Sequence, residues 1–426
     1  MMKIDILRFG FLQDLSKRRR CEIGFQRHAG HSRRLAGLCL LSLIGGVWPI
    51  LPGGAEETST SPEPPANPLD VPAEPIPSQS GYFQSTDATL PLQPPARTQI
   101  GDFALLTRAT LTTVYDDNVE AADDERNEDI FLAFSPSIRA QSLYARHSLG
   151  FEAAGTAAEA LKSGSEDFFD WRIGADGRVD LSEQRKINAA VGYRYDTEDD
   201  ESVDAEDDQD DLSFHLFDAS LSYNVQGDTL GYSVGSSVSR LDAEGSDFDD
   251  RDRTALGVRA STSYAFSDRL SIFAGPSYRY STFDEDVADD GDGRDAEVIS
   301  AQIGAGYRAS RTISTSASIG YSYAAFDDPD REDDDTAIGN IGLTWSPGYG
   351  TTLQLGAGRT LGLTVIDNAD ARTTTTGDAI LSHRLRLGSR SAISSSLSYQ
   401  ISEYSDLDRT DHNIGASLGY GYRLTE

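Results

Sequence analysis

The sequence predicts an all-β protein: a transmembrane, antiparallel, up-and-down β-barrel of about 16 strands (14–18) with a disordered N-terminal arm. From residue 103 onward, bulky apolar residues alternate with small polar ones. In 313–323, for example, Ile, Thr, Ala and Tyr alternate with Ser and Gly. Successive side chains of a strand point to opposite faces. The polar face is small and glycine-rich, and aromatic residues gather near strand ends, which is typical of a barrel in a membrane.

Each strand is predicted from this alternation, and each is long enough to cross a bilayer, which takes about 9–11 residues. The total of 16 is even, as in single-chain bacterial barrels. The predicted strands are 103–115, 129–141, 146–158, 167–181, 187–196, 212–225, 229–241, 251–266, 269–283, 295–308, 312–325, 335–346, 351–364, 371–387, 391–404 and 411–424.

The connections between these strands alternate in length. The short ones are 182–186, 226–228, 267–268, 309–311, 346–350 and 388–390. The long, acidic ones are 116–128, 197–211, 242–250, 284–294 and 327–334. Short turns belong on the periplasmic side of such barrels and long loops outside. With an even number of strands, we expect both termini in the periplasm.

The first 102 residues do not alternate in this way. An apolar run, 35–50, follows Arg33 and Arg34 and precedes the small residues Gly53 and Ala55, which predicts a signal peptide over 1–55. A transmembrane anchor is the alternative. Residues 56–102 are rich in Pro, Glu and Ser and predict a disordered periplasmic linker, either a spacer or a docking segment for a periplasmic partner. The barrel then covers 103–426.

Composition excludes several classes of protein. The net charge of -32 argues against nucleic acid as a partner. A helical membrane protein needs apolar runs of about 20 residues, and the chain has a single, shorter run. Both cysteines, Cys21 and Cys39, fall in the predicted signal peptide. The mature chain is therefore expected to lack disulfides and thiol catalysis.

The segment 111–119, Leu-Thr-Thr-Val-Tyr-Asp-Asp-Asn-Val, resembles the opening hairpin of the "putative β-barrel porin 2" outer-membrane family. Members often begin with a strand ending in Tyr-Asp-Asp/Asn-Asn-Val/Ile and an aromatic residue, whereas this chain has Glu120 there. Such barrels usually finish on an aromatic residue read by the barrel-assembly machinery, whereas this chain ends on Glu426. The resemblance covers about residues 100–426. It implies a barrel, and in some relatives an association with exopolysaccharide export.

Position parity places a set of charged residues on the polar, lumen-facing side of the strands. We predict that seven arginines line the pore: Arg108, Arg172, Arg178, Arg194, Arg259, Arg279 and Arg308. The same face is expected to carry Arg139, Arg384, Arg386, Arg423, Glu152, Asp170, Asp176, Asp180 and Asp218. Rings of charge set pore selectivity, so one interpretation is a constriction for anionic or sugar solutes. The other is a ladder of Arg and acid that fills and rigidifies the wall.

Other chemistry has weaker signals. Asp286, Asp290 and Glu297 match part of a calcium-loop spacing, but Ala288 stands where a ligand should be. We expect no cofactor beyond calcium loosely bound at the acidic loops, which could also bridge to lipopolysaccharide phosphates. His215, near Asp211 and Asp218, and His412, beside Asp411, are candidates for a hydrolase at the barrel rim. Neither lies in a nucleophile or metal motif, so no enzyme is expected.

The sequence therefore predicts an outer-membrane channel of a Gram-negative bacterium that passes polar solutes or, as the resemblance implies, accompanies exopolysaccharide export. The alternative is a non-conducting structural barrel whose acidic loops bind cations, lipopolysaccharide or a partner. A rim hydrolase is a third reading. Expected partners are outer-membrane lipid and lipopolysaccharide, the barrel-assembly machinery and a periplasmic partner of the arm, with no nucleic acid.

Overall fold

The computed structural model describes residues 3–14, 36–44, 97–116, 129–162, 167–197, 212–245, 251–284, 294–329, 331–364, 369, 371–385, 391–405, 407 and 409–423. Among the described residues, no helix is long and apolar enough to cross a membrane.

The predicted all-β antiparallel fold is confirmed. The strands are β1 Lys3–Asp14, β2 Ala36–Ile44, β3 Arg97–Ile100, β4 Phe103–Asp116, β5 Asp129–Ser142, β6 Ser148–Ala160, β7 Phe168–Ser182, β8 Arg185–Thr197, β9 Ser213–Gln226, β10 Leu230–Ala243, β11 Arg253–Ala265, β12 Leu270–Phe283, β13 Ala296–Arg308, β14 Ile313–Phe326, β15 Asp334–Gly348, β16 Thr351–Leu363, β17 Ala371–Arg384, β18 Ser391–Tyr404 and β19 Thr410–Arg423. The 16 predicted strands are β4 to β19, with every bound within three residues of its predicted position.

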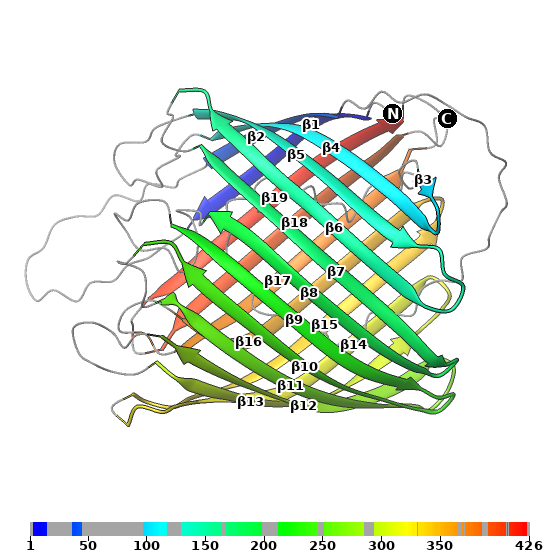
Figure 1. Ribbon diagram of the computed structural model, residues 1–426, viewed down its shortest axis with the longest axis vertical. Coiled ribbons are helices and arrows are strands. Elements are labelled where there is room, and N and C mark those ends of the chain that lie inside the picture. Colours follow the sequence, from blue (N-terminus) through cyan, green and yellow to red (C-terminus); the bar gives the residue numbers. More distant parts are fainter. Residues whose placement is uncertain are drawn as a thin grey trace, which may run out of the picture.

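Neighbouring strands pair in the order of the chain. Each strand from β4 to β18 is antiparallel to the next. Figure 1 shows the strands of the first half slanting one way across the front, and β14 to β19 slanting the opposite way behind them, as two walls of one barrel. This pairing satisfies backbone N–H and C=O groups strand by strand, as a structure in lipid requires.

Two further strands join the series at its ends. β1 pairs with β19 and with β2, and β2 pairs with β4, which brings the strands longer than four residues to 18. The short β3 pairs with the first residues of β4. β1 and β2 lie inside residues 1–55, for which the sequence predicts a signal peptide. Its removal stays a prediction.

The two faces of the sheet differ in a way opposite to that of a soluble protein. We call the face carrying Arg139, Ser300 and Ser398 the inner face and the other the outer face. On the outer face, bulky apolar side chains are exposed, as with Ile319 at 67%. On the inner face, small polar side chains are buried, as with Ser402 at 0%. Exposed apolar side chains on a barrel face lipid, so the inner face surrounds the lumen.

Aromatic side chains mark the height of the apolar band on the outer face. Trp345 lies opposite Ile313 near the short-turn end, and Tyr323 lies ten residues further along β14 toward the long-loop end. Ten residues span about 33 Å along a strand. At a tilt of about 40° this becomes about 25 Å along the barrel axis, the usual height of an apolar barrel band. The strands are therefore long enough to cross an outer membrane.

Candidate functional site: the inner face of the barrel

Cross-strand register places the seven predicted pore-lining arginines on the inner face. Arg108 lies opposite Ser137, Arg172 opposite Arg194, and Arg259 opposite Gly235. The other three of the seven, Arg178, Arg279 and Arg308, share this face by the same register. Arg386 lies outside the described residues. That these side chains line an open pore stays a prediction.

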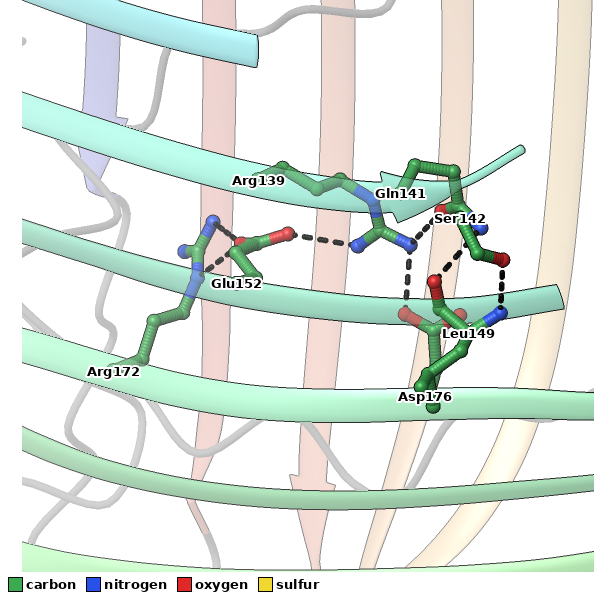
Figure 2. A network of polar contacts seen from close by, with 7 residues as sticks. All are labelled: Arg139, Gln141, Ser142, Leu149, Glu152, Arg172 and Asp176. Carbon is green, nitrogen blue, oxygen red and sulfur yellow. Dashed lines mark hydrogen bonds and ion pairs between the residues drawn. The ribbon is translucent and has the colours of Figure 1, made fainter. Parts of the chain in front are cut away.

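The inner face of β5, β6 and β7 carries a network of ion pairs (Figure 2). Arg139 on β5 donates from Nη1 to Glu152 on β6 at 3.1 Å and from Nη2 to Asp176 on β7 at 2.7 Å. Glu152 also accepts from Nε and Nη2 of Arg172, at 3.0 and 2.9 Å. Gln141 accepts a further bond from Arg139 at 3.2 Å. Four charges on three strands thus neutralise one another.

Register explains why this network forms. Arg139 lies directly opposite Glu152, and Gly150 lies between Gln141 and Asp176 on the neighbouring strands. To reach Asp176, the guanidinium of Arg139 must cross β6 above Gly150. A Cβ atom at position 150 would lie 2.9 Å from Arg139 Nη2 and would overlap the Asp176 carboxylate. Only glycine leaves room for the bridge here.

The wall formed by β4 to β9 carries nearly equal numbers of basic and acidic residues. Two pairs join residues on one strand: Arg178 with Asp180 at 3.0 Å, and Arg194 with Asp196 at 3.2 Å. The inner-face charges of this wall are Arg108, Arg139, Arg172, Arg178, Lys186 and Arg194 against Asp129, Glu152, Asp170, Asp176, Asp180, Asp196 and Asp218. Six basic residues therefore meet seven acidic ones. Partly exposed pairs contribute at most about 1 kcal/mol each, so the network orients side chains more than it stabilises the fold.

Two other inner-face carboxylates lean over a glycine of the neighbouring strand. Asp218 lies opposite Gly192, and a Cβ at position 192 would come within 2.6 Å of its Oδ1. Asp378 lies opposite Gly356 and overlaps the position that a Cβ there would take. Each carboxylate therefore lies flat against the wall. This arrangement keeps charge on the lumen surface without filling the lumen.

At the long-loop end, the outer face carries tyrosines whose hydroxyls donate to carboxylates. Tyr278 donates to Glu297 at 3.1 Å, Tyr280 donates to Asp327 at 2.9 Å, and Tyr323 donates to Asp333. Amphipathic rings are common at the level of lipid headgroups. The sequence pattern of aromatics at strand ends predicted the rings, whereas their acidic partners come from strands or loops whose position only the fold fixes.

Arg240, also on the outer face, lies at the base of the two long loops 242–250 and 284–294 and binds acidic residues there. It binds Asp284 through two hydrogen bonds of 2.7 and 2.5 Å, and this guanidinium holds the pKa of Asp284 below its usual value. Asp252 accepts the backbone N–H of Ala243 at 2.7 Å. Burial raises the pKa of Asp252, and this effect opposes that of the hydrogen bond. Some loop acids therefore hold the strand ends in place.

The histidines proposed for a rim hydrolase have the following surroundings. His215 Nδ1 lies 2.8 Å from the Tyr193 hydroxyl, and Nε2 lies 3.3 Å from Glu244 Oε1. The expected neighbour Asp218 lies on the opposite face of β9, because positions 215 and 218 differ in parity. The proximity read from the sequence is therefore wrong. Asp211 lies outside the described residues.

His412 lies 2.9 Å from the hydroxyl of Tyr399 on the outer face, and the two rings stack. Of the weak calcium candidates, Asp286 and Asp290 lie outside the described residues. Glu297 accepts a hydrogen bond from Tyr278. Within the part of the chain that the structure describes, no group of three or more His, Cys, Asp or Glu residues is placed to hold a metal.

Sequence reasoning missed three parts of this arrangement. It assigned Arg139 and Glu152 to one face but did not pair them, since pairing depends on register. It also missed Asp196, although the spacing Arg-x-Asp within a strand places both side chains on one face and could have indicated this pair. The need for glycine at position 150 has no sequence signal, because it arises from side chains on β5 and β7.

Several solved structures are similar to this chain. No curated protein matches the chain in sequence. OccK1 (OpdK) of Pseudomonas aeruginosa matches with 10% identity and a TM-score of 0.48 over 99% of this chain and 98% of that chain. OccAB3 of Acinetobacter baumannii matches with 9% identity and a TM-score of 0.44 over 99% of both chains. The copper transporter OprC matches with 11% identity and a TM-score of 0.45 over 95% of this chain, which spans 62% of the length of OprC.

A family model matches residues 93–426, a range that includes the whole of β4 to β19. That range also contains the Tyr-Asp-Asp-Asn-Val motif from which the sequence suggested the family. The chain belongs to the outer-membrane β-barrel family described as "Putative beta-barrel porin 2".

Proposed function

We propose that the protein is a porin-type channel that passes polar solutes across the outer membrane of a Gram-negative bacterium. One observation carries this proposal: the inner face is built from small polar and charged residues. Its carboxylates Asp176, Asp218 and Asp378 lie flat against the wall, over Gly150, Gly192 and Gly356 respectively. A barrel of 16 or more strands is wide enough for an aqueous channel, whereas about eight strands are filled by their own side chains. Short turns would face the periplasm and long loops the exterior.

The experiment is single-channel recording in a planar bilayer, with protein purified from outer membranes in the form that the cell delivers there. Steady conductance that scales with salt concentration is the expected result. Folded protein, recognised by its heat-dependent shift on a gel, that gives no conductance would overturn the channel proposal. In that case the balanced ion-pair network of β5 to β7 would favour a structural barrel, with cations, lipopolysaccharide or a partner at its acidic loops.

The N-terminus can be settled on the same sample. Residues 1–55 are proposed to be a signal peptide and 56–102 a periplasmic arm, so the intact mass should correspond to a chain that begins after Ala55. In that chain, β1 and β2 would be absent and β4 and β19 would become direct neighbours. A mass that retains residues 1–55 would instead show that β1 and β2 belong to the mature barrel.

Association with exopolysaccharide export is the narrower proposal, and it rests on the family. Deletion of the gene should then reduce secreted polysaccharide without loss of outer-membrane integrity. We propose no enzymatic activity and no cofactor. Calcium at the acidic loops would be loosely held, and removing it with a chelator should leave conductance in place.

A further inference from the structure

The lumen wall that follows β9 differs in composition from the β4 to β9 wall, which holds the ion-pair network. On β10 to β14, the inner face carries four arginines, and among the described residues of these strands no aspartate or glutamate shares that face. Most other positions are Ser or Gly. The arginines are Arg253, Arg259, Arg279 and Arg308. The β4 to β9 wall is therefore close to neutral in sum, whereas the β10 to β14 wall contributes net positive charge.

The central arginines of this wall lie close together. Arg259 on β11 lies opposite Ser277, and Arg279 on β12 lies opposite Gly257, so the two are diagonal neighbours. Diagonal neighbours have Cα atoms about 7–8 Å apart, which is close enough for both guanidinium groups to bind the same ligand. Arg259 extends over β10, where its Nε lies 3.6 Å from the position of a Cβ at Gly235.

A second group of arginines lies at the short-turn rim. Arg308 is the last residue of β13, and its backbone N–H donates to the carbonyl of Arg269 at 2.8 Å. Arg311 follows in the adjoining turn. All three of these side chains are exposed. Through Ser277, Arg259 is level with Ser300, which lies eight residues before Arg308 on β13. The rim proposed to face the periplasm and the middle of the lumen thus each carry a separate group of arginines.

This charge acts on solutes through the wall as a whole. Arg253, Arg259 and Arg279 also interact within the chain. The charge that the whole wall contributes therefore attracts an anion, without any unpaired guanidinium. At physiological salt the screening length is about 8 Å, which is short compared with the lumen of a barrel of this size. An anion that passes along β10 to β14 is therefore attracted to this wall far more than one on the opposite side.

We propose that the inner face of β10 to β14, with Arg259 and Arg279 at its centre, is the solute track of the channel and takes hydroxyl-rich carboxylates, that is, acidic sugars. The proposal rests on the channel function proposed above. Arginine matches a carboxylate with its planar fork of donors. The surrounding serine hydroxyls donate to and accept from sugar hydroxyls. Glycine positions leave the backbone accessible and the track wide.

The test uses trigalacturonate as the acidic probe and maltotriose as the neutral control in single-channel recording. The wild type should prefer anions in a salt gradient, and trigalacturonate should interrupt its current at concentrations at least about tenfold below maltotriose. The variant R259Q/R279Q should lose most of this difference. Its matched control, E152Q/R172Q, removes two charges of opposite sign from the other wall and should keep the difference.

The outcomes separate the two proposals. Folded wild-type protein without conductance overturns the channel function itself. A conducting wild type that is cation-selective, or that responds equally to both sugars, overturns the track and leaves the channel intact. An equal effect of both double variants also overturns it, because the β10–β14 wall would then have no special role. If R259Q/R279Q fails to fold, the comparison of the two sugars on the wild type still decides.

Discussion

Replacing Ile319 with lysine tests which face of the barrel meets lipid. Ile319 is the seventh of the 14 residues of β14 and is 67% exposed on the outer face. Its cross-strand partners are Ile303 and Gly339, so no acid lies opposite it. A lysine on the lipid face at the bilayer midplane destabilises a barrel by about 2–4 kcal/mol. We therefore expect Ile319→Lys to lower the free energy of unfolding by that amount.

The neighbouring residue on the inner face provides the matched control. Ser318 donates a hydrogen bond to Gln302 Oε1 at 3.1 Å, which contributes about 1 kcal/mol. Ser318→Lys loses this bond but places its ammonium in the lumen, so we expect a loss of about 1 kcal/mol or less. The assay is reversible denaturant unfolding in lipid vesicles, followed by tryptophan emission. If Ser318→Lys were as destabilising as Ile319→Lys, the assignment of the two faces would be refuted.

Two further predictions concern single side chains. Gly150→Ala should displace Asp176 from Arg139, but the free energy of unfolding should change by less than about 1 kcal/mol, because the loss of a partly exposed ion pair and the gain from replacing a glycine within a strand are of similar size. Gly174→Ala is the control, and a much larger loss of stability in Gly150→Ala would contradict this prediction. Arg240 lowers the folded-state pKa of Asp284, so this pair stabilises the fold above the ordinary carboxyl pKa of about 3.9 and stops doing so as pH falls through the lowered value. Asp284→Asn should flatten the change in unfolding midpoint over that acidic range, and an unchanged pH profile would count against the pair.

The strands were predictable from sequence because a barrel strand leaves a period of two along the chain, and β14 shows this in nearly every residue. β1 and β2 were not predicted. Residues 38–43 of β2 are apolar at almost every position, so they lack the alternation and resemble the apolar core of a signal peptide. The pairing of β2 with β4 therefore rests on the fold and has no local signal.

The candidate site was predictable only in part. Parity assigns Arg139 to the inner face, but its partners Glu152 and Asp176 belong to the next two strands. Which residues meet depends on register, and register depends on the lengths of turns and on the burial of whole faces. The same limit explains His215: sequence proximity favours Asp218, whereas the strand turns that carboxylate to the opposite face and Tyr193 and Glu244 take its place.

Cysteine labelling along β14 tests the central claim, that the inner face lines water and the outer face meets lipid. Single cysteines would be placed at positions 316, 317, 318 and 319 in a chain carrying Cys21→Ser and Cys39→Ser, in intact outer membranes. We expect a hydrophilic maleimide to label positions 316 and 318 and to leave 317 and 319 unlabelled. Equal labelling at all four positions, or labelling of 317 and 319 alone, would contradict the account.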